Sequence, residues 1–156
     1  MERDFVIKDN KEGCFLLEEY KHTDKQLWWV LGSLVTSRTI RKELGIVISS
    51  DDNYTWWVAK WEGIVVGFGA VALRKEVATL YHSYVFENFR NRGIYSLMLK
   101  RRVEFIKTQK NIKKIVTTAT KYSKPILEKF GFYETSKRGK YFNMILLDKP
   151  NKTEGK

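Results

Sequence analysis

The stretch VFENFRNRGIYS, Val85–Ser96, decides the fold. A β-branched and aromatic run ends here, a basic loop with one glycine follows, and an apolar helical stripe begins. The first N–H groups of a helix have no intrahelical partner and carry the positive end of its dipole. Gly93 lets the backbone approach an anion closely, and Arg90 and Arg92 add positive charge. The stretch therefore predicts a strand, a loop and a helix that bind a pyrophosphate; the alternative is an ordinary turn with a capping glycine.

Two well-known phosphate-binding loops are absent from this sequence. It contains neither G-x-x-x-x-G-K-[ST] nor G-x-G-x-x-G. The loop is therefore neither a Walker loop nor a dinucleotide fingerprint.

The segments on either side of this loop predict a sheet with one parallel pair. Upstream, Tyr54–Trp61, Ile64–Leu73 and Val77–Phe86 are β-branched and aromatic, with short turns between them, which is typical of an antiparallel meander. Downstream, apolar residues from Ile94 to Ile106 recur at helical spacing, and Lys113–Thr118 is typical of a buried strand. A strand–helix–strand order predicts parallel pairing through a right-handed crossover.

Two helices are expected before the meander. Thr23, with Gln26 three residues later, suits a capping box for a helix that carries Leu27 to Val35. Thr36 or Ser37 can cap a second helix, which Gly45 ends. A short first strand is expected at Phe5–Lys8.

The C-terminal part predicts a short helix and a closing hairpin. Residues 122–129 suit a helix with Pro125 in its first turn. Residues 132–136 and 141–147 suit two strands joined around Arg138-Gly139. The order of all these elements predicts the α/β class with a mixed sheet.

Length and composition predict one globular domain, residues 1–148, with a flexible tail at 149–156. The chain has 156 residues, of which 43% are hydrophobic, enough for a real core. No apolar run is long enough to cross a bilayer, and the N-terminus has no signal-peptide pattern, so we expect a cytoplasmic protein without membrane attachment. Cys14 is the only cysteine, which excludes an intrachain disulfide and a two-cysteine metal site, and we expect no metal.

Positive charge is concentrated in the C-terminal part. The net charge is +11; residues 1–89 hold 11 Lys/Arg against 13 Asp/Glu, and residues 90–156 hold 18 against 5. Such a surface attracts polyanions such as nucleotide phosphates, nucleic acid or acidic lipid. A solvated lysine-rich face is the alternative.

The loop Arg90-Asn91-Arg92-Gly93-Ile94-Tyr95 resembles the coenzyme A loop, [Q/R]-x-x-G-x-[G/A], of the GNAT superfamily of acyl-CoA-dependent N-acetyltransferases. Tyr95 stands where that pattern has a small residue. The stretches KWEGIVVGFGAVAL, SKPILEKFGFYE and YFNMILL resemble the family's central hairpin, its late motif and its final strand. The resemblance covers roughly residues 54–148.

This resemblance implies a GNAT-like fold with a mixed, mostly antiparallel sheet of six to seven strands, flanked by about four helices and splayed at the central parallel pair. It implies acetyl-CoA as co-substrate, with the pantetheine arm along Tyr84–Phe86 and the pyrophosphate on amides of Arg92–Ser96. A backbone N–H near Val85 would stabilise the oxyanion, and an amine would attack directly. The implied cofactor-binding residues are Tyr84, Val85, Phe86, Arg90, Asn91, Arg92, Gly93, Ile94, Tyr95, Ser96, Thr120 and Ser123.

The sequence departs from the family pattern in its late motif. Thr120 falls where an asparagine is common, and Leu127 falls where a tyrosine often protonates the leaving thiolate. Tyr122 or Tyr133 could replace that proton donor, or each is a packing residue.

The general base is also not fixed by the sequence. The third meander strand has no carboxylate, but it carries His82, which titrates near neutral pH. Strand alternation predicts His82 and Tyr84 on one face and Tyr81, Ser83 and Val85 on the other. We expect His82 as base, with Glu87 as the second candidate and a surface or core histidine as the alternative.

Five tryptophans lie in segments that wall the acceptor pocket in the family: Trp28, Trp29, Trp56, Trp57 and Trp61. They would clamp an aromatic or cationic acceptor, or they pack the core.

Two other functions remain open at this point. One is a nucleic-acid-modifying relative, phage-like, whose cationic part holds phosphates through Lys100, Arg101, Arg102, Lys107, Lys110, Lys113 and Lys114. The other is a catalytically inactive module that binds coenzyme A. The acceptor amine, a small molecule or a protein amine, is not identified, and a homodimer is possible.

Overall fold

The computed structural model describes residues 2–8 and 14–147, and the side chains from residue 15 onward. The expected tail at 149–156 and the side chain of Cys14 lie outside these described parts. The N-terminal half consists of β1 (Glu2–Lys8), β2 (Cys14–Lys21), α1 (Lys25–Val35), α2 (Arg38–Leu44), β3 (Tyr54–Trp61), β4 (Ile64–Arg74) and β5 (Val77–Val85). The C-terminal half consists of a 3-10 turn η1 (Glu87–Phe89), α3 (Ile94–Lys107), β6 (Lys114–Ala119), α4 (Lys124–Lys129), β7 (Tyr133–Arg138) and β8 (Tyr141–Leu147).

These strands form one mixed sheet in the order β1-β2-β3-β4-β5-β6-β8-β7, and only β5 and β6 pair in parallel. The predicted α/β fold with a central parallel pair is confirmed. The described sheet has eight strands, one more than expected, because the sequence did not predict β2. The apolar–polar alternation expected of a strand is interrupted in β2, because the charged residue Glu18 is buried. Its carboxylate accepts a hydrogen bond from the Tyr20 hydroxyl at 3.0 Å and pairs with the Lys60 ammonium at 2.7 Å.

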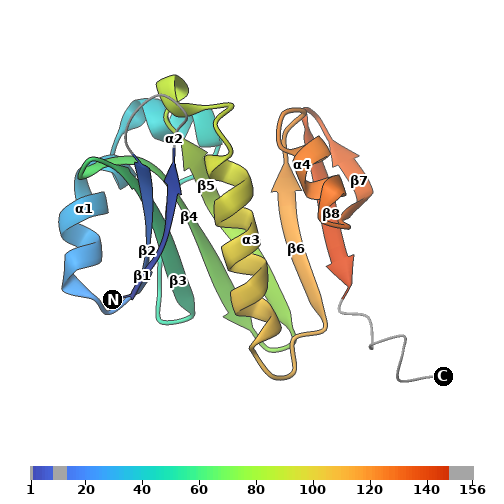
Figure 1. Cartoon of the computed structure of the whole chain (residues 1–156). Coiled ribbons are helices and arrows are strands. Elements are labelled where there is room, and N and C mark those ends of the chain that lie inside the picture. Colours follow the sequence, from blue (N-terminus) through green and yellow to red (C-terminus); the bar gives the residue numbers. More distant parts are fainter. Residues whose placement is uncertain (1, 9–13, 148–156) are drawn as a thin grey trace.

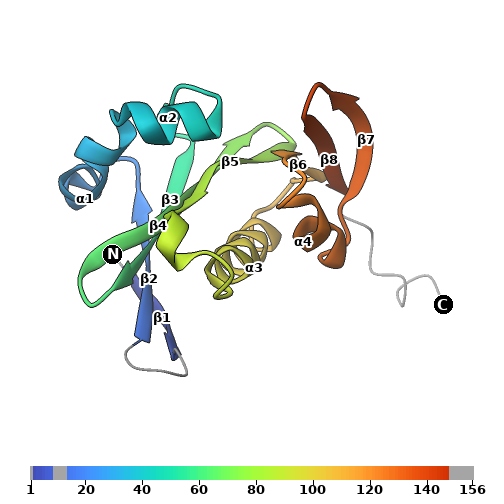
Figure 2. The same cartoon turned by 90° about the horizontal axis from the view of Figure 1, so that it is seen from above.

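The helices cover opposite faces of the sheet, as Figure 2 shows: α1 and α2 lie on one face, and α3 and α4 on the other. Each face has its own buried core. The core beneath α1 and α2 includes Leu27, Trp56 and Phe68. The core beneath α3 and α4 includes Trp57 and Met98.

Helix boundaries agree with most of the expected caps. Ser37 caps α2, since its hydroxyl accepts a hydrogen bond from the Ile40 N–H at 3.3 Å, and Gly45 ends the helix with φ of 73°. The prediction for Thr23 was wrong, because Asp24 is the residue that precedes α1. The Asp24 carboxylate accepts from the Lys21 N–H at 2.8 Å and does not cap the helix.

The parallel pair opens after a few residues, as expected. β5 and β6 pair only from Val77 to Thr79, opposite Lys114–Val116, and Thr117 then donates its hydroxyl proton to the Leu80 carbonyl at 3.2 Å. β6 meanwhile stays paired with β8 along its whole length. Figure 1 shows β5 and β6 diverging towards the end of the sheet where α3 begins.

Two features are absent from the described residues. None of the helices in the described ranges is long and apolar enough to span a bilayer. The same ranges hold no cluster of three or more His, Cys, Asp or Glu side chains that could bind a metal ion.

The contact between α2 and β8 can be tested at Gly45. Gly45 and Gly63 both have positive φ, so alanine at either position costs backbone strain of about 1 kcal/mol. An added Cβ at Gly45 would also clash with the Tyr141 hydroxyl, whereas at Gly63 it would meet open space. We expect Gly45→Ala to lower the free energy of unfolding by about 1 kcal/mol more than Gly63→Ala in urea titrations. Equal losses would contradict this packing.

Candidate functional site

A β-bulge lies in β5 where it borders the opening. Phe68 pairs with Tyr84 and Ala70 with Tyr81, so His82 and Ser83 together face Gly69. His82 has φ of 54°, the left-handed conformation that one type of bulge uses at its first residue. The prediction that strand alternation puts Tyr81 on the face opposite His82 and Tyr84 was therefore wrong: Tyr81 stacks on His82 at 5.3 Å between ring centroids, on the same face as Tyr84.

The backbone of Val85 faces the opening. The Phe86 N–H donates to the Val66 carbonyl at 2.9 Å, so alternation turns the N–H and C=O of Val85 to the other edge of β5. β6 does not pair with β5 at that level. This edge can therefore hydrogen-bond to an extended ligand.

The loop after β5 presents free space at the start of α3. Gly93, with φ of 83°, precedes the helix, and no atom lies within 4 Å of the place that a Cβ there would take. The first intrahelical bond runs from the Leu97 N–H to the Gly93 carbonyl at 3.0 Å. The amides of residues 94–96 therefore have no partner within the helix, which is the arrangement that binds anions. Ile94 itself turns its side chain into the core.

Arg90 joins the loop to α2. Its Nε donates to the Val85 carbonyl at 2.7 Å, and its Nη2 donates to the Glu43 carboxylate at 2.8 Å. Glu43 also accepts the Tyr84 hydroxyl proton at 2.8 Å. Hydrogen bonds from Arg90 and Tyr84 lower the pKa of Glu43, while burial and the Glu43 contact raise the pKa of Tyr84 to about 12. The other loop arginine, Arg92, lies 5.4 Å from the Phe89 ring centroid.

Sequence reasoning missed Glu43. It lies 41 residues before Tyr84 and 47 before Arg90, so nothing local in the sequence indicates their contact. Only the packing of α2 against β5 brings this carboxylate beside the end of the strand.

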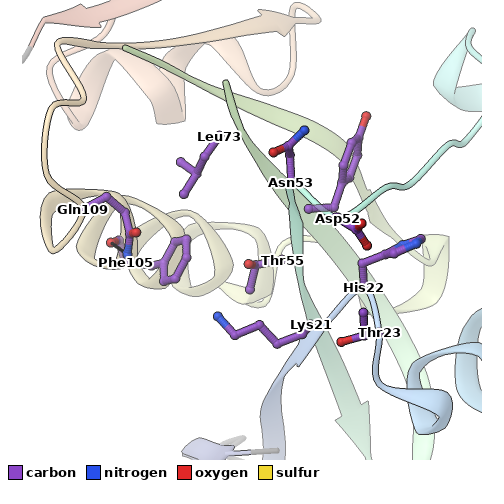
Figure 3. Close-up of a pocket in the computed structure, with 10 residues that line it drawn as sticks. Lys21, His22, Thr23, Asp52, Asn53, Thr55, Leu73, Phe105 and Gln109 are labelled. Carbon is purple, nitrogen blue, oxygen red and sulfur yellow. Dashed lines mark hydrogen bonds between the residues drawn. The ribbon is translucent and has the colours of Figure 1, made fainter. Parts of the chain in front are cut away.

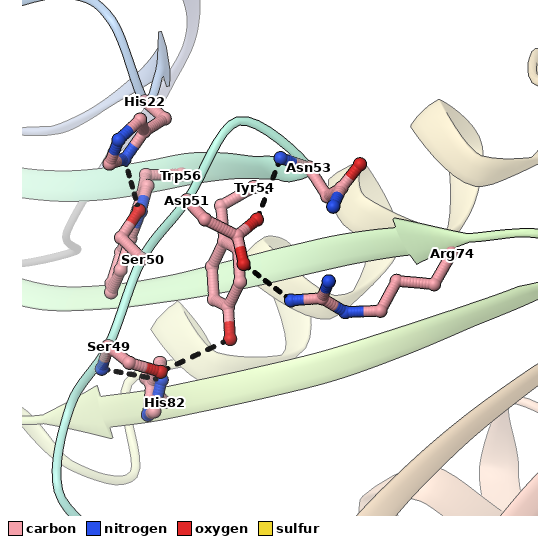
Figure 4. Close-up of polar contacts among 9 residues, drawn as sticks. All are labelled: His22, Ser49, Ser50, Asp51, Asn53, Tyr54, Trp56, Arg74 and His82. Carbon is pink, nitrogen blue, oxygen red and sulfur yellow. Dashed lines mark hydrogen bonds and ion pairs between the residues drawn. The ribbon is translucent and has the colours of Figure 1, made fainter.

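His82 is buried within an aromatic cluster. Its ring stacks on Trp56 at 5.7 Å and lies 6.2 Å from the ring of Tyr54. The Ser49 N–H donates to Nε2 at 3.3 Å, which places the ring proton on Nδ1, an atom without a partner (Figure 4). Burial lowers the pKa of His82 to about 4, so the ring is neutral at pH 7 and a weak base.

Polar contacts hold the segment between α2 and β3 against this aromatic cluster. The Ser50 hydroxyl bonds to His22 Nδ1 at 2.7 Å and accepts from Trp56 Nε1 at 2.9 Å. Asp51 pairs with Arg74 at 2.5 Å (Figure 4). The segment is therefore a defined wall on the α1 and α2 face of the bulge.

The predicted residues of the late motif divide into two groups. Thr120 and Ser123 bond to each other: the Thr120 N–H donates to the Ser123 hydroxyl at 3.0 Å, and the Ser123 N–H to the Thr120 hydroxyl at 3.3 Å. Tyr95 lies on α3 with its side chain half-buried, and burial raises the pKa of its hydroxyl. Tyr122 instead points to solvent, 77% exposed, and Glu87 is exposed in η1.

Most tryptophans serve the core. Trp56 and Trp57 are fully buried on opposite faces of the sheet, so neither can clamp an acceptor as it stands. Trp28 packs edge-on against Trp56, and Trp61 packs against Phe15. Trp29 alone presents a largely exposed ring among these five, at 80%.

The basic residues proposed as nucleic-acid contacts are not all on the surface. Arg102 is fully buried, which excludes it from such a contact. The exposed members of the set are Lys100, Lys107, Lys110 and Lys113.

A hollow of about 420 Å³ lies at the opposite end of the sheet (Figure 3). It lies where β2 ends and β3 begins, and Phe105, near the end of α3, and Gln109, just after that helix, form its other side. The Lys21 ammonium lies 5.5 Å from the Phe105 ring centroid. None of the residues predicted for the coenzyme site lines this hollow.

Comparison with known proteins gives the class to which this fold and this loop belong. The family described as "Acetyltransferase (GNAT) domain" matches residues 21–148, and the chain belongs to this family. No match was found among curated protein sequences.

Solved structures with the same fold share little sequence with this chain. Escherichia coli ElaA is 12% identical with a TM-score of 0.67, covering 83% of this chain and 97% of its own. The Vibrio cholerae spermidine N-acetyltransferase, solved with CoA and spermine, is 14% identical with a TM-score of 0.64, covering 84% and 95%. The Campylobacter jejuni N-acetyltransferase PseH, solved with acetyl coenzyme A, is 9% identical with a TM-score of 0.58, covering 86% and 99%.

The pKa of His82 makes stability depend on pH. The folded value of about 4 lies below the ordinary 6.5, so between these pH values the unfolded chain binds more protons than the folded one. Stability from this group is almost complete above pH 6.5 and is lost as pH falls towards 4, by roughly 3 kcal/mol. We expect His82→Phe, which keeps the stacking, to remove this part of the slope in urea unfolding measured from pH 7 to 4. Parallel slopes would show that His82 titrates normally.

Proposed function

We propose that this chain is an N-acetyltransferase that transfers an acetyl group from acetyl-CoA to a primary amine by direct attack in a ternary complex. The observation that carries the proposal is the position of the free helix terminus. The opening between β5 and β6 and the amides that begin α3 at Gly93 lie at the same end of the sheet. A coenzyme with an extended arm and a diphosphate needs both.

The residues present fit the two parts of coenzyme A. The diphosphate would bind the amides of residues 94–96, where Gly93 leaves space and Arg92 adds charge. The arm would pair with the Val85 edge of β5. Arg90 would hold the end of β5 in position, because its Nε donates a hydrogen bond to the Val85 carbonyl.

The chemistry that we propose uses this edge as well. The Val85 N–H faces the opening, where it would stabilise the oxyanion that forms when the amine attacks the thioester carbonyl. Bringing both substrates into one site supplies much of the rate, because attack becomes effectively unimolecular.

Three groups are candidates for the proton of the attacking amine. His82 and Glu87 are those that the sequence suggested; His82 acts only if it releases the Ser49 N–H from Nε2. Glu43 is the third, because it places a carboxylate beside Tyr84 at the end of β5. Tyr122 remains the sequence-based candidate for the proton donor.

The acceptor is proposed as a primary amine of a small molecule or a protein. One similar structure was solved with spermine, which shows that this fold accommodates an amine in that protein. We propose a cytoplasmic enzyme, and a homodimer is compatible with the fold.

Two alternative functions remain testable. The exposed lysines of the basic set favour a nucleic-acid-modifying protein, whose affinity for single-stranded DNA would fall steeply with salt. The missing strand carboxylate and the exposed Tyr122 favour an inactive module, which would bind coenzyme A without releasing thiol from acetyl-CoA in the presence of any amine.

Gly93 allows a direct test of the diphosphate site. Glutamate there places bulk and negative charge against the amides that open α3, so we expect acetyl-CoA binding to be abolished in calorimetry. Gly93→Ala is the matched control: it carries the same backbone strain at φ of 83°, and its methyl group meets no atom. It should bind within about tenfold of the wild type. Unchanged affinity in folded Gly93→Glu would refute the site.

A further inference from the structure

The three C-terminal strands have one face that none of the described helices covers. The core beneath α1 and α2 draws on β2 to β5, whereas β6, β8 and β7 extend past these helices on the same side, as Figure 2 shows. Side chains of these strands are correspondingly exposed: Thr118 is, and so are Tyr133 at 46% and Leu147 at 43%. We call this surface, the α1–α2 side of β6, β8 and β7, the open face.

Cross-strand pairs show which side chains belong to the open face. Phe142 lies on the opposite side, because the ammonium of a lysine in α4 is 4.6 Å from its ring centroid. Strand alternation therefore turns its neighbours Tyr141 and Asn143 to the open face. Arg138 lies directly opposite Tyr141 in the hairpin and shares its face. Thr118 of β6 likewise lies opposite Asn143.

The charges on the open face are all positive among the described residues. β6, β7 and β8 contain a single acidic residue, Glu134, and it pairs with Lys124 of α4 at 2.9 Å on the other side of the sheet. Arg138 lies at the hairpin end of the open face. Lys114 lies at the far end, because it alternates with the buried Ile115. An anionic ligand is therefore favoured along the whole face.

Helix α2 adds positive charge along the border of the open face. The helix ends against the hairpin, since a Cβ on Gly45 would meet the Tyr141 hydroxyl. Arg41 lies one turn before Gly45, on the same side of the helix, and is exposed. Glu43, the one acidic residue of this helix, is already paired with Arg90 at 2.8 Å.

The open face also borders the path by which an amine would reach the thioester. The amides proposed for the diphosphate begin α3, which lies on the opposite side of the sheet. A coenzyme that enters the β5–β6 opening from that side leaves the α1–α2 side for the attacking amine. β6 is both one edge of the opening and the first strand of the open face.

We propose that the open face binds an acidic polypeptide and that this polypeptide carries the acceptor amine. This inference rests on the proposed acetyl transfer. Carboxylates of the polypeptide pair with Arg138, Arg41 and Lys114, and its backbone hydrogen-bonds to the side chains of Thr118 and Asn143. In the transfer, the amine nitrogen bonds to the acetyl carbon and the C–S bond breaks, with its electron pair moving to sulfur. One proton leaves the nitrogen, and the thiolate takes up one proton.

Length and reactivity both favour a polypeptide. β8 has seven residues, which span about 20 Å when extended, and cations lie at both ends of the face that it crosses. A small amine is too short to contact both ends, whereas an extended segment of about six residues reaches them. A nucleic acid carries the same charge, but the exocyclic amines of its bases are poor nucleophiles, because their lone pairs are delocalised into the ring.

The first experiment measures binding to the open face without turnover. An octapeptide that alternates glutamate with serine, with a free N-terminus, one lysine and a fluorophore at its C-terminus, is titrated with the wild-type chain in the presence of coenzyme A. Its counterpart has glutamine in place of each glutamate. In low salt, fluorescence anisotropy should show that the acidic peptide binds at least about tenfold more tightly. Equal binding of the two peptides would overturn the inference.

Charge reversal locates the bound peptide. Arg138→Glu and Arg41→Glu should each weaken binding of the acidic peptide about tenfold. Lys137→Glu is the matched control: Lys137 is the neighbour of Arg138 in β7 and is also exposed, but its ammonium lies 5.2 Å from the Phe142 ring centroid on the α4 side. It should stay within about twofold of the wild type. An equal loss in all three variants would indicate attraction by net charge alone and would overturn the open face as the site.

The second experiment measures acetyl transfer to the same peptides by release of free thiol. We expect Arg138→Glu to lower kcat/KM for the acidic peptide about tenfold through KM, with kcat and acetyl-CoA affinity within about twofold of the wild type. A loss confined to kcat would contradict a docking role. Single-stranded DNA that binds more tightly than the acidic peptide, or a dimer that Arg138→Glu dissociates in sedimentation, would also overturn the inference.

The outcomes separate this inference from the proposed function. If the wild type binds no acetyl-CoA in calorimetry, the proposed function fails, and with it the role of the peptide as acceptor, even where anisotropy detects the peptide. If the wild type acetylates the neutral peptide as efficiently as the acidic one, the proposed function stands and only the inference fails.

Discussion

The candidate site depends on the unequal backbone pairing of β6 with its two neighbouring strands. The strand pairs with β8 at all six of its residues but with β5 at only three. Buried backbone groups need partners, so the edge of β5 beyond Thr79 must find them elsewhere. The Thr117 hydroxyl satisfies the Leu80 carbonyl, and Arg90 satisfies that of Val85. What remains is a strand edge on which an extended ligand can complete the pairing.

The bulge in β5 and the loop that follows the strand determine which side chains lie near that edge. The extra residue at His82 turns three aromatic or imidazole side chains to one face and leaves Gly69 opposite. The space at Gly69 admits the Arg102 guanidinium from the other face. The ion pair between Glu43 and Arg90 then joins α2 to the loop that precedes α3. One irregularity in β5 thus positions groups on both faces of the sheet.

The sequence predicted the features that depend on local pattern: the meander, the crossover helix, the loop at Gly93 and the parallel pair all appear where expected. It did not predict β2, since the buried Glu18 resembles a surface residue until Lys60 and Tyr20 are placed beside it. It also put Tyr81 on the wrong face, because nothing in VATLYHSYV marks the bulge. Glu43 and Arg102 were unreachable from the sequence: their roles come from contacts over 30 residues away.

Amide hydrogen exchange with and without acetyl-CoA tests the central claim most directly. If the coenzyme binds between the separated strands, the amides of Val85 and of residues 94–96 gain protection. Protection confined to the hollow near Lys21 and Gln109, or no change anywhere, would contradict the account.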